Sequence, residues 1–430
     1  MRQCSSCFKR RKKLITFIIS AIKIIILLGF LITIHELGHF IVAKLCKVKV
    51  NEFAIGFGPV IWKKQGKETK YSLRLIPLGG FNSLEGEEER SDNEKSFSQA
   101  SIPKRIAIVA AGAVVNIVFA ICVYFILTSS QGTYISNEVS ETLDGYAAEQ
   151  IGIQKNDKII ELDNKKISSK KDLNDVLEKS DGSEIKLKIE RNNEILEYNI
   201  KPTERKSKST GIYLDEKCKI VTVEKNSSSE RQGLKANDII TKINNEEING
   251  DRNKALEIIG KQEEAKSIIM TVKRGSEEIN VELIPDYIST YYLGVNLKEA
   301  PDTLINRLIN GGIQTQEFLF SIIDNLKQLF TGKVGVDQMM GPVGISEVVA
   351  KTDGIIEFIE MMALISLSLG VTNLLPIPAL DGGKILILII EAIRRKPLDQ
   401  QLEINIQLLG FSILIALSLY VTYNDILRIF

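Results

Sequence analysis

Two histidines occur in the 430-residue chain, and both lie in the stretch HELGH, as His35 and His39. Side chains four residues apart share one face of a helix, so both imidazole rings can donate a nitrogen to the same metal ion. Glu36 follows the first histidine and could take a proton from a water molecule activated by that metal. The pattern predicts hydrolysis assisted by Zn²⁺. The alternative is that these polar residues only end an apolar helix at a membrane surface.

A catalytic zinc site usually has three protein ligands and a water molecule, so HELGH supplies only part of it. The chain has no further histidine, which leaves a carboxylate as the expected third ligand. Asp381 is the single carboxylate in an apolar run over residues 361–390. Because an isolated carboxylate is costly in such a run, it indicates a site, unless it merely ends a helix at the interface.

Four apolar segments are each about as long as a helix that crosses a hydrocarbon core of roughly 30 Å. The predicted spans cover residues 14–34, 106–128, 361–390 and 404–427. Lys23 interrupts the first span, and it either reaches to the interface or faces something polar. Spans one and three run in the same direction, because one complete out-and-back passage separates them. HELGH and Asp381 are therefore expected on the same side of the membrane.

The sequence around Asp381, NLLPIPALDGG, predicts a break in the third apolar segment. Pro376 and Pro378 cannot continue a helix, and Gly382 and Gly383 allow the backbone to approach a neighbour closely. Non-helical backbone at membrane depth is tolerated where protein or a water-filled cavity satisfies its polar groups. A hydrolytic site needs such a cavity.

A charged, turn-rich insert separates spans two and three, and it contains a duplication. Residues 152–167 (GIQKNDKIIELDNKKI) and 233–248 (GLKANDIITKINNEEI) are identical at six of sixteen positions. Each copy predicts a turn, a short strand, an amphipathic helix and a further strand. The predicted domains cover residues 131–205 and 206–286, and a connecting helical segment follows over residues 287–354.

The two copies resemble PDZ domains, with Asn156 and Asn237 at the usual glycine of the core motif. This resemblance implies domains that bind an extended peptide beside an exposed sheet edge. The alternative is a pair of small sheet domains that only space the membrane segments.

HELGH, NLLPIPALDGG and the PDZ-like insert together resemble the site-2 protease family of intramembrane zinc metalloproteases, and within it the bacterial RseP-like group. The resemblance implies a polytopic α-helical membrane protein with four transmembrane helices and two inserted PDZ-like α+β domains. It also implies a membrane re-entrant β-loop at residues 53–83, where alternating apolar and polar residues between Gly and Pro turns independently predict a β-hairpin. Its strand edge would pair with an unwound substrate.

The family resemblance also assigns roles to individual residues. It implies His35, His39 and Asp381 as zinc ligands and Glu36 as the catalytic base. Asn373 would help to hold the substrate or the developing oxyanion. The resemblance further implies substrate binding for four residues: Gly112, Asn116, Pro376 and Pro378. Gly112 could instead serve only close helix packing, and Ala113 stands where many members have proline.

A function and partners follow from the same resemblance. Such an enzyme cuts the transmembrane segment of single-span membrane proteins, such as an anti-sigma factor already trimmed by an upstream site-1-type protease, or a remnant signal peptide. The lipid bilayer is the other expected partner, and the net charge of +1 gives no indication of nucleic-acid binding.

The distribution of basic residues predicts the orientation. Residues 44–74 hold eight Lys and Arg, and residues 394–396 are all basic, so both loops are expected in the cytoplasm. The active site of this inner-membrane protein would then face the cytoplasm, and the PDZ-like domains would lie outside. The basic N-terminal extension, residues 1–13, opposes this orientation. Cys4 and Cys7 form a C-x-x-C within it, which is best explained as part of a solvated tail.

Two other functions fit parts of the sequence. An inactive membrane scaffold would hold envelope peptides with its PDZ-like pair and would need neither Glu36 nor a metal. A soluble-type zinc peptidase tethered to the membrane would need a third ligand soon after His39, and Glu52 is the nearby candidate.

Overall fold

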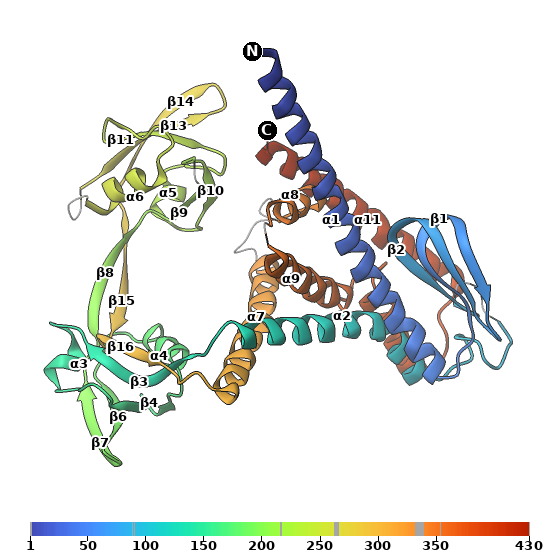
Figure 1. The fold of residues 1–430 in the computed structure, drawn as a ribbon, viewed down its shortest axis with the longest axis horizontal. Coiled ribbons are helices and arrows are strands. Elements are labelled where there is room, and N and C mark those ends of the chain that lie inside the picture. Colours follow the sequence, from blue (N-terminus) through green and yellow to red (C-terminus); the bar gives the residue numbers. More distant parts are fainter. Residues whose placement is uncertain are drawn as a thin grey trace. The chain divides into compact units, whose positions relative to one another are not determined.

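The computed structural model describes residues 2–87, 89, 91–215, 217–261, 266–331, 339–352 and 354–429, with side chains from residue 19 to residue 427 except residue 330. The chain forms two compact units, whose elements are labelled in Figure 1. The first unit comprises Met1–Gln131 and Asn310–Phe430, and the second comprises Gly132–Ile309.

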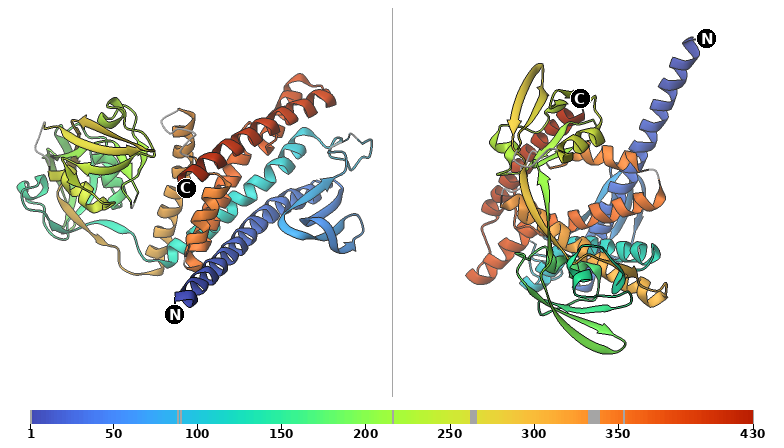
Figure 2. Two further views of the ribbon diagram at one scale, coloured as in Figure 1. Left: turned by 90° about the horizontal axis from the view of Figure 1, so that it is seen from above. Right: turned by 90° about the vertical axis from the view of Figure 1, so that its left-hand side faces the viewer.

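The first unit consists mainly of long helices. Its principal helices are α1 (Arg2–Leu45), α2 (Ile102–Ser130), α9 (Ile355–Asn373), α10 (Asp381–Arg394) and α11 (Gln400–Ile429). Helices α1 and α9 both pack against α2 (Figure 2). Within the described residues, four segments are long and apolar enough to cross a membrane: Ile19–Leu45, Ile102–Ser130, Ile355–Asn373 and Gln400–Leu427. Each of them overlaps one predicted span.

Helix α1 extends beyond the first predicted span at both ends. It runs unbroken to Leu45, so HELGH lies within the helix and not after it. It also begins at Arg2, so residues 2–13 continue the same helix and do not form a separate segment. The side chains of Cys4 and Cys7 lie outside the described part of the structure.

The third predicted span, residues 361–390, is two helices in the structure. Helix α9 ends at Asn373 and α10 begins at Asp381, so the prolines interrupt the helix as predicted. The glycines then permit tight packing of the α10 N-terminus. A Cβ atom at Gly382 would lie 2.2 Å from the carbonyl oxygen of Leu375, and one at Gly383 would lie 2.3 Å from that of Ile377. Neither position can hold a larger residue without moving the segment before Asp381.

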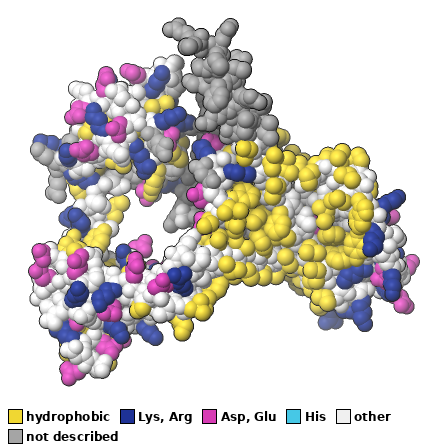
Figure 3. All heavy atoms as spheres, viewed as in Figure 1, with side chains coloured by type: hydrophobic (Ala, Val, Ile, Leu, Met, Phe, Trp, Pro, Cys, Tyr) yellow, Lys and Arg dark blue, Asp and Glu magenta, His cyan; other side chains and the backbone are white. Residues whose placement is uncertain are grey.

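The expected β-hairpin over residues 53–83 is present as two long antiparallel strands, β1 (Val50–Gln65) and β2 (Lys70–Leu84). Many of its apolar side chains are exposed, including Ile61, Trp62 and Leu75. On the face shown in Figure 3, apolar side chains cover much of the first unit, whereas charged side chains are spread over the second. This surface of the first unit fits contact with lipid.

The second unit contains two similar sheets. One has six strands in the order β16-β3-β4-β6-β7, with β5 beside β4, and the other has the order β12-β11-β13-β14. The first includes β3 (Ile135–Thr142), β4 (Lys158–Leu162), β5 (Lys165–Lys166), β6 (Ile185–Arg191), β7 (Glu194–Ile200) and β16 (Val295–Glu299). The second includes β11 (Ile239–Ile243), β12 (Glu246–Glu247), β13 (Ile268–Arg274) and β14 (Glu277–Leu283). One short amphipathic helix belongs to each repeat, α4 (Lys170–Leu177) and α6 (Arg252–Lys261).

The two repeats do not follow one another along the chain, as the predicted domains at residues 131–205 and 206–286 would. Strand β15 (Asp286–Tyr292) pairs with β8 (Thr203–Ser209), and β16 pairs with β3 at the start of the first repeat. The second repeat is therefore inserted into the first. The prediction of a helical segment over residues 287–354 is wrong at its start, which consists of these two strands. The β-branched and aromatic residues of DYISTYY favour a strand.

The duplication extends to matching side-chain interactions. Asp157 accepts two hydrogen bonds of 2.7 and 2.6 Å from Arg191, which also donates to the carbonyl oxygen of Gly152. In the second repeat, Asp238 accepts two hydrogen bonds of 2.7 Å from Arg274, and Arg274 also donates to the carbonyl oxygen of Gly233. The asparagines that replace the usual glycine, Asn156 and Asn237, both have φ of 75°, a left-handed conformation that asparagine tolerates better than most residues.

Helix α7 (Leu304–Phe330) is followed in the first unit by the shorter helix α8 (Pro342–Lys351). Two charged side chains bind the ends of α8. Asp425 of α11 accepts a hydrogen bond of 2.8 Å from the backbone N–H of Gly344, and Lys23 of α1 donates one of 2.5 Å to the carbonyl oxygen of Thr352. Lys23 thus faces a polar group, one of its two predicted environments, and both charges complement the helix dipole.

Candidate functional site

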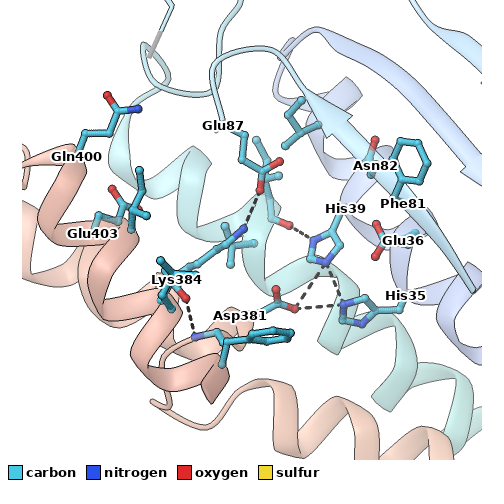
Figure 4. Close-up of a pocket in the computed structure, with 18 residues that line it drawn as sticks. His35, Glu36, His39, Phe81, Asn82, Glu87, Asp381, Lys384, Gln400 and Glu403 are labelled. Atoms are coloured by element: carbon cyan, nitrogen blue, oxygen red, sulfur yellow. Dashed lines mark hydrogen bonds and ion pairs between the residues drawn. The ribbon is translucent and has the colours of Figure 1, made fainter. Parts of the chain in front are cut away.

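Helix α1 places the two histidines on one face, as their spacing predicts. The Nε2 atoms of His35 and His39 are 3.1 Å apart, and the rings meet edge to face. Figure 4 shows Glu36 beside them, on the side of Phe81 and Asn82 of β2. The helix therefore presents two possible metal ligands and a carboxylate to the same space.

Asp381 is the first residue of α10, in the C-terminal segment of the first unit, and its carboxyl group points toward the two histidines (Figure 4). Its Oδ2 atom lies 3.2 Å from Nε2 of His35 and 3.6 Å from Nε2 of His39. A carboxylate at a helix N-terminus is favoured by the helix dipole, and the proline-containing break directs this terminus toward α1. The structure thus brings together the three residues that were predicted as ligands.

The spacing of these three atoms suits a zinc ion. Ligands about 2.0–2.1 Å from a tetrahedral zinc would be about 3.3 Å from one another, and the three observed separations lie between 3.1 and 3.6 Å. Oδ2 of Asp381 is also buried, and no described residue forms a hydrogen bond with it. Within the part of the chain that the structure describes, these residues form the one group of at least three such side chains able to hold a metal ion.

Neighbouring groups on α2 determine how the histidines present their nitrogens. Nδ1 of His39 lies 2.8 Å from the carbonyl oxygen of Ile108. A carbonyl oxygen only accepts, so Nδ1 carries the proton and Nε2 keeps its lone pair for a metal. The Nδ2 atom of Asn116 lies 3.4 Å from Nδ1 of His35, and Oδ1 of Asn116 is buried with no partner in the described part of the chain. Because amide orientation is an assignment, turning it over lets Oδ1 accept from Nδ1–H of His35 in the same way.

Gly112 lies directly against the two histidines. A Cβ atom at this position would be 2.4 Å from Nε2 of His39 and 2.8 Å from Nε2 of His35. Gly38 of α1 likewise has no room for a side chain, because a Cβ atom there would be 2.6 Å from the carbonyl oxygen of Ala111. Gly112 was predicted to bind substrate or to allow close helix packing, and its surroundings favour a third role, which is to leave space for the imidazole rings.

A cavity of about 660 Å³ adjoins His35, Glu36, His39 and Asp381. Its other lining residues are Phe81, Asn82, Leu84, Glu87, Ile108, Val109, Ala379, Lys384, Gln400, Glu403, Ile404, Gln407, Leu408 and Phe411. Asn373, Pro376 and Pro378, all predicted to contact substrate, do not line it. Asn373 instead ends α9, and the prolines lie in the segment that leads to Asp381.

Several polar residues of the cavity were not singled out from the sequence. Lys384 pairs with Glu87 at 2.9 Å, and Gln407 accepts a hydrogen bond of 2.5 Å from the backbone N–H of Ala379. Among the residues that the structure describes, neither amide atom of Asn82 in β2 has a hydrogen-bond partner. Gln407 could have been found as a polar residue in an apolar span, whereas nothing in the local sequence marks Asn82 or Glu87 as a residue of the cavity.

Glu52, the ligand candidate for a tethered soluble peptidase, is engaged elsewhere. It accepts hydrogen bonds from Ser72, Lys70 and Arg74, at 2.6, 2.9 and 2.9 Å. Burial alone would raise the pKa of Glu52, but these hydrogen bonds outweigh burial and lower the pKa to about 2. The carboxylate is thus held in the hairpin and does not belong to the histidine and aspartate group.

The sequence profile of peptidase family M50 matches residues 23–417. The chain belongs to peptidase family M50. A protein of Clostridium acetobutylicum that is named a zinc metalloprotease is 30% identical to this M50 peptidase over 404 residues, which cover 94% of this chain and 96% of that protein. The prediction of a zinc metalloprotease with a membrane-protein architecture is confirmed by these matches and by the four apolar helices.

Two further relatives carry more specific names. The regulator of sigma-W protease RasP of Bacillus subtilis is 28% identical to the M50 peptidase over 450 residues, covering 96% of this chain and 100% of that protein. The regulator of sigma E protease of Haemophilus influenzae is 27% identical over 447 residues, with coverage of 96% and 100%. Among solved structures, the HtrA3 PDZ domain bound to a phage-derived ligand matches 20% of this chain and 93% of its own, with 18% identity and a TM-score of 0.19.

Proposed function

We propose that this M50 peptidase hydrolyses a peptide bond within the membrane segment of single-span membrane proteins. The observation that carries the proposal is the convergence of His35, His39 and Asp381 on one point beside a cavity of about 660 Å³. The helices that supply these residues belong to a unit whose long helices are apolar enough to cross a membrane. A protease site built on such helices is placed to cut substrates that are themselves in the bilayer.

The proposed reaction assigns one step to each group. Nε2 of His35, Nε2 of His39 and Oδ2 of Asp381 would hold Zn²⁺, which supplies Lewis-acid polarisation of a carbonyl group and of a water molecule when bound. Glu36 accepts a proton from water as its oxygen attacks the carbonyl carbon. The same carboxyl group then gives that proton to the amide nitrogen as the C–N bond breaks, which leaves a free acid and a free amine. Asn373 is proposed to assist with substrate or the oxyanion, from its position at the end of α9.

The β-hairpin has a proposed role in opening the substrate. A transmembrane helix hides its carbonyl groups in its own hydrogen bonds, so the segment must unwind before hydrolysis. The end of strand β2, residues 80–84, pairs with β1 along one edge, and the described residues pair with it on no other. Its remaining edge could pair with the unwound segment where Phe81, Asn82 and Leu84 line the cavity.

We further propose an inner-membrane orientation with the active site toward the cytoplasm, based on the basic residues at 44–74 and 394–396. The repeat domains of the second unit would then lie outside and act as PDZ-like modules that exclude substrates with a large external part. The names of the sigma-factor regulating relatives support an anti-sigma factor as substrate, after trimming by an upstream protease. Remnant signal peptides are a second proposed substrate class.

Cleavage of a tagged single-span substrate that lacks its outer domain tests the proposal. Wild type and Glu36→Gln are compared in the same membranes, with bound zinc measured in parallel. We expect cleavage by wild type alone, with zinc retained by both proteins. Equal behaviour of the two proteins would overturn the catalytic role of Glu36 and favour the alternative of an inactive scaffold that holds envelope peptides.

A further inference from the structure

We propose that the side chain of Asn82 hydrogen-bonds a peptide group of the unwound substrate and thereby sets which bond lies at the metal centre. This inference rests on the proposed function. It adds a positioning residue from β2 to the groups that α1 and α10 supply.

Asn82 lines the same cavity as Glu36 and His39, and Figure 4 shows the three residues together. Both Nδ2 and Oδ1 of Asn82 are buried and have no hydrogen-bond partner among the described residues. Its neighbour across the hairpin is Phe53 of β1, whose ring has no donor or acceptor to offer. The fold thus places a side-chain amide at the cavity and leaves both its donor and its acceptor without a partner among the described residues.

Two other polar side chains of the cavity wall have partners inside the protein. Lys384 is paired with Glu87, and the Gln407 amide oxygen accepts from the backbone of Ala379, so that only its Nε2 is unpaired. A buried amide without partners is costly, so in a native structure a ligand or ordered water completes it. The missing partner must both donate and accept.

A peptide group is the ligand that fits this requirement. The side chains of a membrane segment are mostly apolar, so its polar groups are those of the backbone, and unwinding frees their N–H and C=O from the helix. An amide side chain offers one donor and one acceptor, and the N–H and C=O of one extended residue point to the same side. A substrate residue held by Asn82 through these two groups would regain both hydrogen bonds at a fixed place beside Glu36 and the histidines. The register of the substrate relative to the metal would follow.

The variant Asn82→Leu tests this role, because leucine has a similar size and cannot hydrogen-bond. Asn174→Leu is the matched control, since Asn174 is exposed on α4 in the second unit. Two single-span substrates are compared, one with an entirely aliphatic membrane segment and one with asparagine at successive positions. The readouts are kcat and KM, the cleaved bond by mass spectrometry, and bound zinc.

We expect Asn82→Leu to lower kcat/KM about tenfold or more on both substrates, the effect of losing one or two hydrogen bonds to the substrate. It should also spread cleavage over neighbouring bonds, while zinc content and the control remain unchanged. A merely structural role would reduce zinc or folded protein without moving the cleaved bond.

Three results would overturn the inference in different ways. Equal rates and one unchanged bond for wild type and Asn82→Leu would remove Asn82 from substrate binding. A loss confined to the asparagine-containing substrate would identify a substrate side chain, not a peptide group, as the partner. Loss of zinc from Asn82→Leu would make the residue structural. If wild type itself cleaves neither substrate, the proposed function fails instead.

Discussion

Gly112 of α2 lies so close to His39 of α1 that a Cβ atom on it would be 2.4 Å from the imidazole Nε2. That nitrogen is one of the three proposed zinc ligands. The proposed metal site therefore requires that position 112 carry no side chain. This requirement falls on α2, whereas both histidines lie on α1.

Gly112→Ala is expected to displace one or both imidazole rings, because the methyl group and the ring cannot occupy the same space. A displacement of about 1 Å can reduce the rate by about 100-fold, and we expect bound zinc to fall as well. Zinc analysis and substrate cleavage measure both effects. Gly312→Ala in α7 is the control, because a Cβ atom there meets nothing within 4 Å. Normal zinc and activity in Gly112→Ala would contradict the proposed position of the ligands.

Asn116→Leu is expected to weaken zinc binding about 10–100-fold, the usual effect of removing a group that orients a ligand histidine. Oδ1 of Asn116 is the available acceptor for the Nδ1–H of His35, and leucine offers none. Competition with a chelator of known affinity measures the change. Ser366→Ala serves as a nearby control, since the Ser366 hydroxyl donates to the backbone oxygen of Asn116 and not to its side chain. Unchanged zinc affinity would show that Asn116 does not orient His35.

Asp425→Leu is expected to lower the thermal midpoint and to loosen α8. The N-cap residue of α8, Gly341, has no side chain, and Asp425 takes over its function by accepting from the N–H of Gly344. Removing such a cap costs about 1 kcal/mol. Hydrogen exchange in α8 should rise locally, whereas Tyr423→Phe at an exposed position of the same helix should leave it unchanged. Equal exchange in both variants would exclude the capping role.

The ion pair of Asp157 and Arg191 predicts acid sensitivity in the first repeat. Burial raises the pKa of Asp157, but hydrogen bonds from Arg191 and from the backbone of Gln154 outweigh it and lower the pKa below the ordinary 3.8. A carboxylate with a lowered pKa stabilises the folded state above pH 3.8, and this stabilisation is lost as the pH falls through the folded-state pKa.

Asp157→Asn should therefore destabilise the repeat by about 3 kcal/mol at neutral pH, because it leaves Arg191 without its counter-charge. The difference from wild type should shrink in acid. Hydrogen exchange of β4 and β6 as a function of pH measures it in the full-length protein. Asp163→Asn, at an exposed turn, is the control. A constant difference across the pH range would mean that the ion pair is not the cause.

The sequence alone was sufficient to select the three residues that meet at the candidate metal site and the four apolar helices. His35 and His39 are four residues apart on a helix, so their shared face follows from helical geometry. Asp381 was identifiable because a lone carboxylate in an apolar run is costly without a partner. The four spans follow from length and composition, and the duplication is visible in the repeated Asn-Asp pairs at Asn156 and Asn237. Each of these inferences depends on local pattern or on the cost of burying charge.

Tertiary structure decided what depends on contacts between distant segments. The sequence gives no sign that Gly112 faces the histidines, that β16 returns to the first repeat, or that the amide of Asn82 is unpaired at the cavity. Nor does it show that Pro376 and Pro378 lie in the segment that leads to Asp381 and are not among the residues that line the cavity. Such features arise from close packing and strand pairing between residues far apart in the chain. Local propensity carries no information about them, because the same short sequence can meet many different neighbours.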